Sequence, residues 1–227
     1  MKVLVTGGSG FLGRNLIRAL TKEKFEVISC SRTRSNEDVP QINCDINELS
    51  PWHLQDTKMV IHCAAKVGFS GRYSDFYKVN CLGTQNLISS CLKAGVKYFI
   101  YISSPSVVFD GHHIVGGDET LPYATKPKSF YAATKAIAER MILSEKNLNS
   151  VILRPHLIFG PDDTNLLPAI IKALKSGKLF RWCEEDYLAD FTYIEDCVDA
   201  ILKTIGYICN STDLQYKVFF VSSGQPV

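Results

Sequence analysis

Tyr131 and Lys135 are the residues whose types and spacing could transfer a proton. They lie four positions apart in a run, 129–147, that is expected to be helical, so both side chains leave the same face. An ammonium beside a phenol favours the phenolate and lowers the pKa of the tyrosine, as proton transfer near neutral pH requires. A helix with a half-buried aromatic residue and a solvated lysine has the same spacing, so the pair gains meaning only from the other motifs.

A glycine-rich turn near the start of the sequence predicts a dinucleotide site. The strand Lys2 to Thr6 runs into Gly7-Gly8-Ser9-Gly10-Phe11-Leu12-Gly13 and then into a helix with an apolar face. Gly7 or Gly8 permits the tight turn, Gly10 lets the backbone approach a pyrophosphate, and Gly13 lets the helix pack on the strand. The helix N-terminus offers amide donors to the phosphates. A turn without a ligand is the alternative, and the order of strand, turn and helix argues against it.

Arg32 predicts which dinucleotide is bound. The second strand (25–30) leads into Ser31-Arg32-Thr33-Arg34, and the first acid after it is Glu37. A carboxylate at this place takes the ribose hydroxyls of NAD, whereas an arginine accommodates the 2′-phosphate of NADP. The sequence therefore favours NADP(H) over NAD, with Arg32 on the phosphate, although two solvated arginines in a loop would look the same. A third short strand (41–44) is followed by Asp45-Ile46, where an adenine would lie.

Small and polar residues follow the next two strands. The strand 58–62 leads into Ala64-Ala65, which would let a ligand lie against the backbone, and the strand 98–104 ends in Ser103-Ser104. Because the carboxyl ends of parallel strands meet at one edge of a sheet, we expect these residues to border the same crevice.

A long helix over 74–94 is expected between these two strands, with Asn80 on or beside its apolar stripe. A buried asparagine needs partners, so Asn80 is either an amide satisfied by packing or part of a proton relay. Residues 110–128 contain many Gly and Pro and show no periodicity, which predicts a loop that covers or borders the site.

The alternation of strands and helices over the first 155 residues predicts the fold: an α/β, doubly wound parallel sheet, or Rossmann fold. We expect a dinucleotide-binding domain over 1–160 and a small, truncated substrate-binding part over 161–227, interleaved with the last strands of the sheet. The other expected elements are a strand at 150–154, a turn at 155–161, a helix at 165–176, a strand-to-helix turn from 190 capped near Asp196, and a last strand from Tyr216 to Val221.

Composition excludes several classes of function. The 227 residues carry a net charge of +2, which gives no electrostatic case for nucleic acid. No apolar run approaches the length of a membrane span, and because the sequence opens on a strand rather than on a charged and then apolar stretch, we expect no leader. The 8 cysteines form no Cys-x-x-Cys pair, which is typical of reduced cysteines in a cytoplasmic protein. His112-His113 lacks partners at ligand spacing, so no metal site is expected.

Along the chain come the glycine-rich turn, Ala64-Ala65, Asn80, Ser104, the Tyr131–Lys135 pair and Arg154-Pro155. Together these motifs resemble those of an extended short-chain dehydrogenase/reductase, and the resemblance covers nearly all 227 residues. Within that superfamily the chain is similar to the 3β-hydroxysteroid dehydrogenase group. Segments 103–109 and 154–161 resemble the sterol-4α-carboxylate 3-dehydrogenases, and segments 64–68, 80–86 and 131–140 resemble the 2-alkyl-3-oxoalkanoate reductases.

The resemblance implies roles that agree with the chemistry. Tyr131 would be the general acid or base, Lys135 would lower the tyrosine pKa and hold the nicotinamide ribose, Ser104 would bind the substrate oxygen, and Asn80 would complete a proton path. The cofactor-binding set that it implies is Gly7, Gly10, Phe11, Leu12, Gly13, Arg32, Asp45, Ile46, Ala64, Ala65, Tyr131, Lys135 and Pro155.

The leading hypothesis is therefore an NADP(H)-dependent oxidoreductase acting on a secondary alcohol or ketone of a hydrophobic β-hydroxy or β-keto acid, or of a 3β-hydroxysteroid-like substrate. Lys66 and Arg72 are candidate anchors for a substrate carboxylate, and solvated loop charges are the alternative. A nucleotide-sugar epimerase or dehydratase, and a non-catalytic NADP(H)-binding scaffold, stay open as other functions. Related proteins continue for about another hundred residues, the usual size of a second lobe. The resemblance also leaves a homodimer open.

Overall fold

The core of the computed structural model is a seven-stranded sheet in the order β3-β2-β1-β4-β5-β6-β9, in which every pair of neighbours is parallel. The strands are β1 (Lys2–Thr6), β2 (Glu26–Ser31), β3 (Gln41–Asn43), β4 (Met59–His62), β5 (Tyr98–Ile102), β6 (Asn149–Pro155) and β9 (Val218–Val221). The structure describes residues 1–34, 37–68, 70–164, 166–177, 188–211, 213–214 and 217–226. The predicted doubly wound parallel sheet is confirmed.

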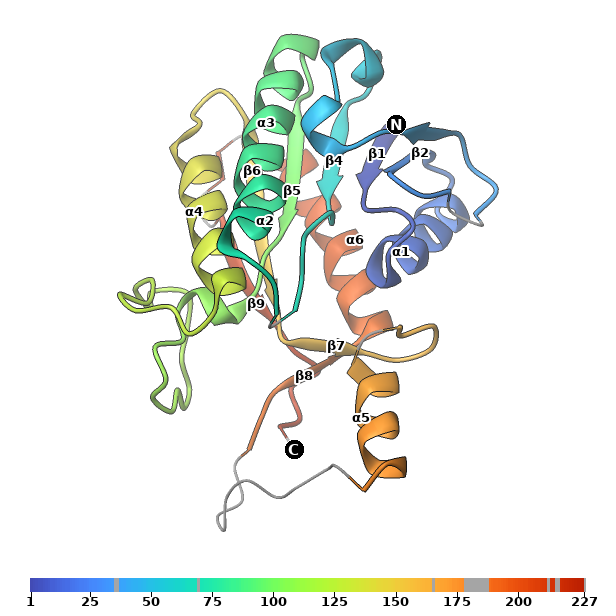
Figure 1. Ribbon diagram of the computed structural model, residues 1–227. Coiled ribbons are helices and arrows are strands. Elements are labelled where there is room, and N and C mark those ends of the chain that lie inside the picture. Colours follow the sequence, from blue (N-terminus) through green and yellow to red (C-terminus); the bar gives the residue numbers. More distant parts are fainter. Residues whose placement is uncertain are drawn as a thin grey trace.

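Helices cover both faces of the sheet, and in Figure 1 α3 and α4 lie in front of it while α6 lies behind. One face carries α1 (Phe11–Lys22) and α6 (Ile194–Asn210); the other carries α2 (Tyr73–Tyr77), α3 (Gly83–Ala94) and α4 (Phe130–Ser144). The central strands are buried from both sides and therefore read as continuous apolar runs. In β1, Val3 and Val5 belong to the core under α1 and α6, and Leu4 belongs to the opposite core.

The helix predicted over 74–94 is interrupted by a π-helical turn, Lys78–Leu82, between α2 and α3. This turn buries Asn80, whose side chain bonds to the backbone of Lys66 and to Thr134 of α4. The extra residue in the turn rotates the chain so that an inward-facing amide reaches these partners. Periodicity could not reveal it, because one inserted residue does not remove the apolar stripe on either side.

A smaller unit lies below the main sheet in Figure 1. The prediction of a turn over 155–161 was wrong for β7 (Leu157–Phe159), which pairs in parallel with β8 (Phe191–Tyr193). Its partner lies about thirty residues further on, so no local signal marked it as a strand. The helix predicted near 165–176 is confirmed as α5 (Leu166–Lys175).

The C-terminal elements complete the main sheet. Helix α6 begins at Ile194 rather than near Asp196, with Tyr193 at its N-cap. The last strand begins at Val218, and the predicted start at Tyr216 lies outside the described residues. Both α6 and β9 thus belong to the layers of the main sheet although they follow residue 160. The division into a dinucleotide-binding domain over 1–160 and a substrate-binding part over 161–227 stays a prediction.

Four further observations concern the described residues. No helix among them is both long and apolar enough to cross a membrane. Within the same ranges, no group of three or more His, Cys, Asp or Glu side chains is arranged to hold a metal ion. The seven cysteines there are free, and Cys183 lies outside the described part. Residues 110–128 form a loop, as predicted.

Candidate functional site

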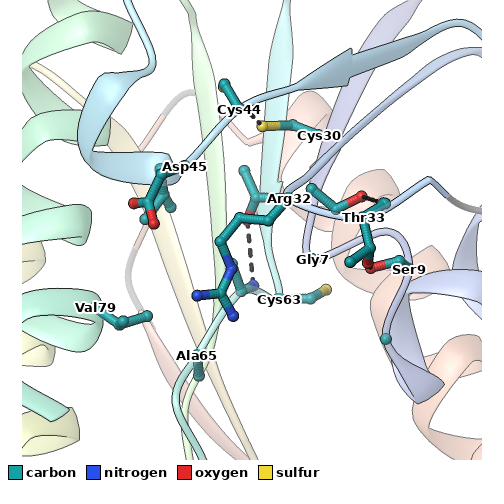
Figure 2. A pocket seen from close by; sticks show the side chains of 15 residues that line it. Gly7, Ser9, Cys30, Arg32, Thr33, Cys44, Asp45, Cys63, Ala65 and Val79 are labelled. Carbon is teal, nitrogen blue, oxygen red and sulfur yellow. Dashed lines mark hydrogen bonds between the residues drawn. The ribbon is translucent and has the colours of Figure 1, made fainter. Parts of the chain in front are cut away.

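A pocket of about 250 Å³ lies at the carboxyl ends of β1 to β4, beside the first turn of α1 (Figure 2). The predicted cofactor residues that line it are Gly7, Gly10, Arg32, Asp45, Ile46, Ala64 and Ala65. The other lining residues, for which the sequence predicts no role, are Thr6, Ser9, Cys30, Ser31, Thr33, Cys44, Cys63 and Val79. Most of these directly flank predicted positions, so extending each motif by one residue would have found them.

The glycine turn brings the start of α1 unusually close to the end of β1. Gly7 has φ +70°, and a Cβ on it would approach the backbone of Ala64 within 2.8 Å. A Cβ on Gly13 would overlap the Gly7 carbonyl oxygen and lie 2.8 Å from the Gly8 Cα. Gly10 forms the N-cap of α1 without a side chain, so the first amides of the helix face the pocket without competition. A side chain at Gly7 or Gly13 would therefore force α1 away from β1 and Ala64 and disrupt this glycine cradle.

Two residues of the predicted set, Phe11 and Leu12, start α1 behind the glycine turn and do not line the pocket. Phe11 is buried in the core under α1 and α6, with Leu12 packed against the same cluster. Their backbone amides, rather than their side chains, belong to the first turn that borders the pocket.

Arg32 follows β2 and directs its exposed guanidinium into the pocket, as Figure 2 shows. Glu37, the first acid after it, is engaged elsewhere: the Arg18 Nε of α1 lies 3.1 Å from both of its carboxylate oxygens. Arg18 also contacts the Asp162 carboxylate at 2.7 Å. This outer ion-pair cluster keeps the Glu37 carboxylate away from the pocket wall.

Hydroxyl groups hold the loop after β2 against the glycine turn. Thr33 Oγ1 donates to Ser9 Oγ at 3.0 Å, and Ser31 Oγ donates to the Thr33 carbonyl at 2.7 Å. Gln41 Nε2 reaches the same carbonyl at 3.0 Å. The loop that carries Arg32 is therefore tied to both neighbouring segments of the pocket.

Asp45 is the single acid among the residues that line the described pocket. Its carboxylate accepts from the Asn47 backbone amide at 2.9 Å and from Asn47 Nδ2 at 2.7 Å. These bonds to Asn47, with a smaller contribution from the Arg32 charge, hold the pKa of Asp45 below its usual range. Ile46 begins the short 3₁₀ turn that Asp45 caps.

The second part of the site lies on α4 and at the end of β5. Ser129 caps α4 by accepting from the Ala132 amide at 3.1 Å, which fixes the turn that carries Tyr131. Burial raises the pKa of Tyr131 to about 12, and a hydrogen bond with the Ser104 side chain opposes this rise. Ser104 is the second residue after β5, and the structure brings it to Tyr131.

Lys135 is 1% exposed and lies one helical turn from Tyr131. Its Nζ donates to the Ile102 carbonyl at the end of β5 and lies 4.0 Å from the centroid of the Tyr101 ring. Burial lowers the pKa of Lys135 to about 7, and the Glu139 carboxylate opposes this fall. The Ser104 hydrogen bond thus lowers the phenol pKa of Tyr131 against the effect of burial, and the predicted effect of Lys135 on that pKa stays a prediction.

Asn80 joins three segments of the site. Its Oδ1 accepts from the Lys66 amide at 2.8 Å, and its Nδ2 donates to the Lys66 carbonyl at 3.1 Å and to Thr134 Oγ1 at 3.0 Å. These contacts satisfy the buried amide within the protein, and the part of Asn80 in a proton path stays a prediction. Asn80 thereby fixes the loop after β4 relative to α4.

His62, which the sequence analysis treated only as the end of a strand, links the two parts of the site. Its Nδ1 lies 2.7 Å from Thr6 Oγ1 and its Nε2 lies 3.0 Å from Thr84 Oγ1. Because Thr84 donates its own proton to the Asn80 carbonyl at 2.7 Å, we assign the imidazole proton to Nε2. Burial, helped by the Lys135 charge, lowers the pKa of His62 to about 3. A histidine at the end of an apolar strand, before small residues, was the available signal.

The other predicted residues lie near the same edge but make different contacts. Pro155 ends β6 and does not line the pocket. Lys66 places its Nζ 5.1 Å from the centroid of the Phe76 ring, and Arg72 contacts the Asp75 carboxylate at 3.4 Å with 84% of its side chain exposed.

Comparisons with known proteins agree with this architecture. The chain is 37% identical to the bovine (Bos taurus) sterol-4-alpha-carboxylate 3-dehydrogenase, decarboxylating, over 98% of its own length, and it spans 65% of that relative. It is 34% identical to the 2-alkyl-3-oxoalkanoate reductase of Stenotrophomonas maltophilia, covering 100% of this chain and 72% of that protein.

Among solved structures, the UDP-glucuronic acid 4-epimerase from Bacillus cereus, in complex with NAD, superimposes with a TM-score of 0.85 and 25% identity over 100% of this chain and 80% of the other. Residues 4–227 match the family profile described as the 3-beta hydroxysteroid dehydrogenase/isomerase family. The chain belongs to the 3-beta hydroxysteroid dehydrogenase/isomerase family.

Proposed function

We propose that this chain is an NADP(H)-dependent oxidoreductase that interconverts a secondary alcohol and a ketone on a hydrophobic β-hydroxy or β-keto acid, or on a 3β-hydroxysteroid-like substrate. The observation that carries the proposal is the meeting of two features at one edge of the sheet. These are the glycine cradle with Arg32, and the Tyr131–Ser104 pair backed by Lys135.

The pocket residues fit a dinucleotide. A Cβ on Gly7 would collide with the Ala64 backbone and one on Gly13 with the Gly7 carbonyl oxygen, so these glycines let α1 start close behind β1. The first turn of α1 would then supply amide donors to a pyrophosphate beside Gly10. Arg32 would bind the 2′-phosphate, because its guanidinium points into the pocket while Arg18 holds the Glu37 carboxylate outside it. NADPH, when bound, supplies the hydride that reduces the carbonyl carbon.

Tyr131 would supply the proton. Its raised pKa keeps the phenol protonated at neutral pH, so it can donate to the carbonyl oxygen as the alcohol forms, and the reverse transfer would serve oxidation. The Ser104 hydroxyl, beside the phenol, would donate a hydrogen bond to the same substrate oxygen and stabilise the charge that develops on it. Lys135 would hold the cofactor ribose, and Asn80 would keep the loop after β4 in register with α4.

The names of the relatives support the substrate class. One is a sterol-4-alpha-carboxylate 3-dehydrogenase and another a 2-alkyl-3-oxoalkanoate reductase, so both names describe a carboxylate near the reacting position. Lys66, which follows the pocket residue Ala65, is the cation that we propose to bind this carboxylate in the present chain.

The test is NADPH oxidation with a panel of 3-oxo acids and 3-keto sterols. Tyr131→Phe is expected to lower the rate by about 100-fold or more while NADPH binding persists, because general acid catalysis contributes about 10² to 10⁴. Tyr98→Phe, at the opposite end of β5, is the matched control and should keep the wild-type rate. A Tyr131→Phe protein with full activity would contradict the proposed role.

A nucleotide-sugar epimerase or dehydratase is the second candidate, because solved structures of a UDP-glucuronic acid 4-epimerase match the fold at 25% identity. In that case NAD would stay bound through purification, and UDP-glucuronic acid would be consumed without added NADPH. A purified protein that retains no NAD, does not consume UDP-glucuronic acid and reduces a 3-oxo acid would decide in favour of the reductase.

A further inference from the structure

A buried ion pair lies one helical turn beyond Lys135. Arg154 Nε and NH2 contact the two Glu139 carboxylate oxygens at 3.1 and 2.7 Å, in a bidentate arrangement. The Glu139 and Arg154 side chains are only 0% and 3% exposed. Burial of two charges is costly, and an apolar pair of similar volume would pack at least as well, so stability alone does not account for these residues.

The pair is connected to Lys135 through both of its elements. Lys135 and Glu139 are four residues apart on α4 and therefore share one face of the helix. Arg154 lies on β6, the neighbour of β5, and the Ile102 carbonyl of β5 accepts the Lys135 hydrogen bond. The ion pair thus fixes α4 on β6, and the Lys135 hydrogen bond fixes it on β5, the strand that precedes Ser104.

Building on the proposed function, we propose that Glu139, held by Arg154, is a positioning residue that keeps the Lys135 side chain an ammonium directed at the end of β5. The charge of Lys135 is what would hold the cofactor ribose beside Tyr131. No other role assigned to the site uses the Glu139–Arg154 pair.

Among the described groups around Lys135, Glu139 supplies the negative charge. Other titratable groups also face Lys135. They are His62 at the end of β4, Cys63 just after it, Cys81 in the π-helical turn, Tyr101 on β5 and Tyr131 on α4. Burial lowers the pKa of His62 to about 3, raises that of Cys81 to about 11, and raises those of Cys63 and Tyr101, so these groups are neutral at pH 7. Tyr131 is neutral there for the same reason.

Aromatic rings cover the far side of the pair. The Arg154 guanidinium carbon lies 5.5 Å from the centroid of the Tyr123 ring, which belongs to the loop 110–128, and 5.3 Å from that of Phe220 on β9. Burial, followed by the nearby Glu139 carboxylate, raises the pKa of Tyr123 to about 12, so this phenol adds no charge at pH 7. The rings exclude water from the ion pair, which strengthens the influence of the Glu139 charge on Lys135.

The energetic consequence concerns the protonation of Lys135. Burial alone favours the neutral amine, and its pKa of about 7 already places Lys135 near the midpoint at neutral pH. Replacement of Glu139 by a neutral residue would leave burial without its main opposing influence and would add repulsion from an unpaired Arg154. The lysine would then lose its proton below pH 7.

The decisive experiment is an NMR titration of protein labelled with ¹³Cε-lysine, in which Lys135→Met identifies the Lys135 signal. The midpoint is expected near pH 7 in the wild type and about one pH unit lower in Glu139→Gln, a tenfold change in the protonation equilibrium. Glu139→Asp should restore most of the difference. Glu195→Gln, an exposed acid on α6, removes one negative charge elsewhere and should leave the midpoint unchanged.

Because Glu139→Gln leaves a buried arginine unpaired, the double variant Glu139→Gln/Arg154→Met provides a second test without an isolated charge. Circular dichroism verifies that each variant is folded, and a lowered Lys135 midpoint in the double variant is again expected. An unchanged midpoint in either folded variant would overturn the inference.

The titration needs no substrate, so it is separable from the proposed function. If the wild type reduces a ketone, the basic limb of the plot of kcat against pH should move to lower pH in Glu139→Gln, and Glu139→Asp should restore it. A basic limb that does not move would overturn the link between Glu139 and catalysis. If the wild type binds NADPH but reduces no ketone, the proposed function fails while the titration still decides whether Glu139 sets the charge of Lys135.

Discussion

His62 should make the folding stability depend on pH in a way that one substitution can isolate. The imidazole is 1% exposed, is bonded at both nitrogens, and has a pKa of about 3 in the folded chain. An unfolded histidine has a pKa of about 6.5. Below that value the unfolded chain binds a proton that the folded chain does not, so stability falls as the pH drops from about 6.5 to about 3.

The magnitude follows from these two pKa values. A gap of about 3.5 corresponds to a total loss of about 5 kcal/mol at pH values well below 3, of which about 4 kcal/mol is lost between pH 7 and pH 3 and about 2 kcal/mol by pH 5. In His62→Gln the titrating group is gone, while the broken hydrogen bonds of a buried network cost about 1–3 kcal/mol at every pH. The deficit of the variant should therefore shrink by about 2 kcal/mol between pH 7 and pH 5.

Urea unfolding of both proteins at pH 7, 6 and 5, followed by circular dichroism, measures this difference. His112→Gln, in the exposed loop 110–128, is the control and should follow the wild-type curve. A stability deficit of His62→Gln that is the same at pH 7 and pH 5 would refute the assignment of a neutral, buried imidazole.

Two further predictions concern the pocket and the substrate. Gly13→Ala should weaken NADPH binding at least tenfold and destabilise the fold by about 1–3 kcal/mol, because its Cβ overlaps the Gly7 carbonyl. The control, Gly206→Ala in an open part of α6, should instead stabilise the fold by about 0.5–1 kcal/mol. Equal effects of the two alanines on NADPH affinity, measured by nicotinamide fluorescence, would contradict the cradle. Lys66→Ala should raise the KM for a 3-oxo acid about tenfold, because a charge-assisted hydrogen bond to the carboxylate is lost. An unchanged KM in steady-state assays would exclude Lys66 as the anchor, and the same test would then be made on Arg72.

Much of the main sheet could be predicted because its signals are local. The strand Lys2–Thr6 is a run of residues buried on both faces, and the glycine turn after it obeys steric limits that only glycine meets. Once the strands were known to be parallel, the residues after them had to share one edge, which is why Arg32, Asp45 and Ala64 line one pocket.

What could not be predicted depends on partners that are distant in sequence. β7 is a strand because it pairs with β8, and the π-helical turn forms because Asn80 bonds to the Lys66 backbone and to Thr134. The burial of Lys135 and the hydrogen bond between Tyr131 and Ser104 both depend on how α4 packs on the end of β5, so the spacing of Tyr131 and Lys135 alone could not indicate the pKa of either side chain. The role of His62 likewise requires two threonines from other elements.

A fluorescence titration of the purified protein with NADPH and NADH tests the central claim most directly. We expect NADPH to bind at least tenfold more tightly, since a charge-assisted bond to the 2′-phosphate contributes about 1.5–3 kcal/mol. Arg32→Ala should abolish this preference without changing the affinity for NADH, whereas Arg34→Ala, an exposed neighbour that does not line the pocket, should preserve it. Equal affinity for the two dinucleotides, or a preference for NADPH that survives Arg32→Ala, would contradict the assignment of this pocket to NADP(H).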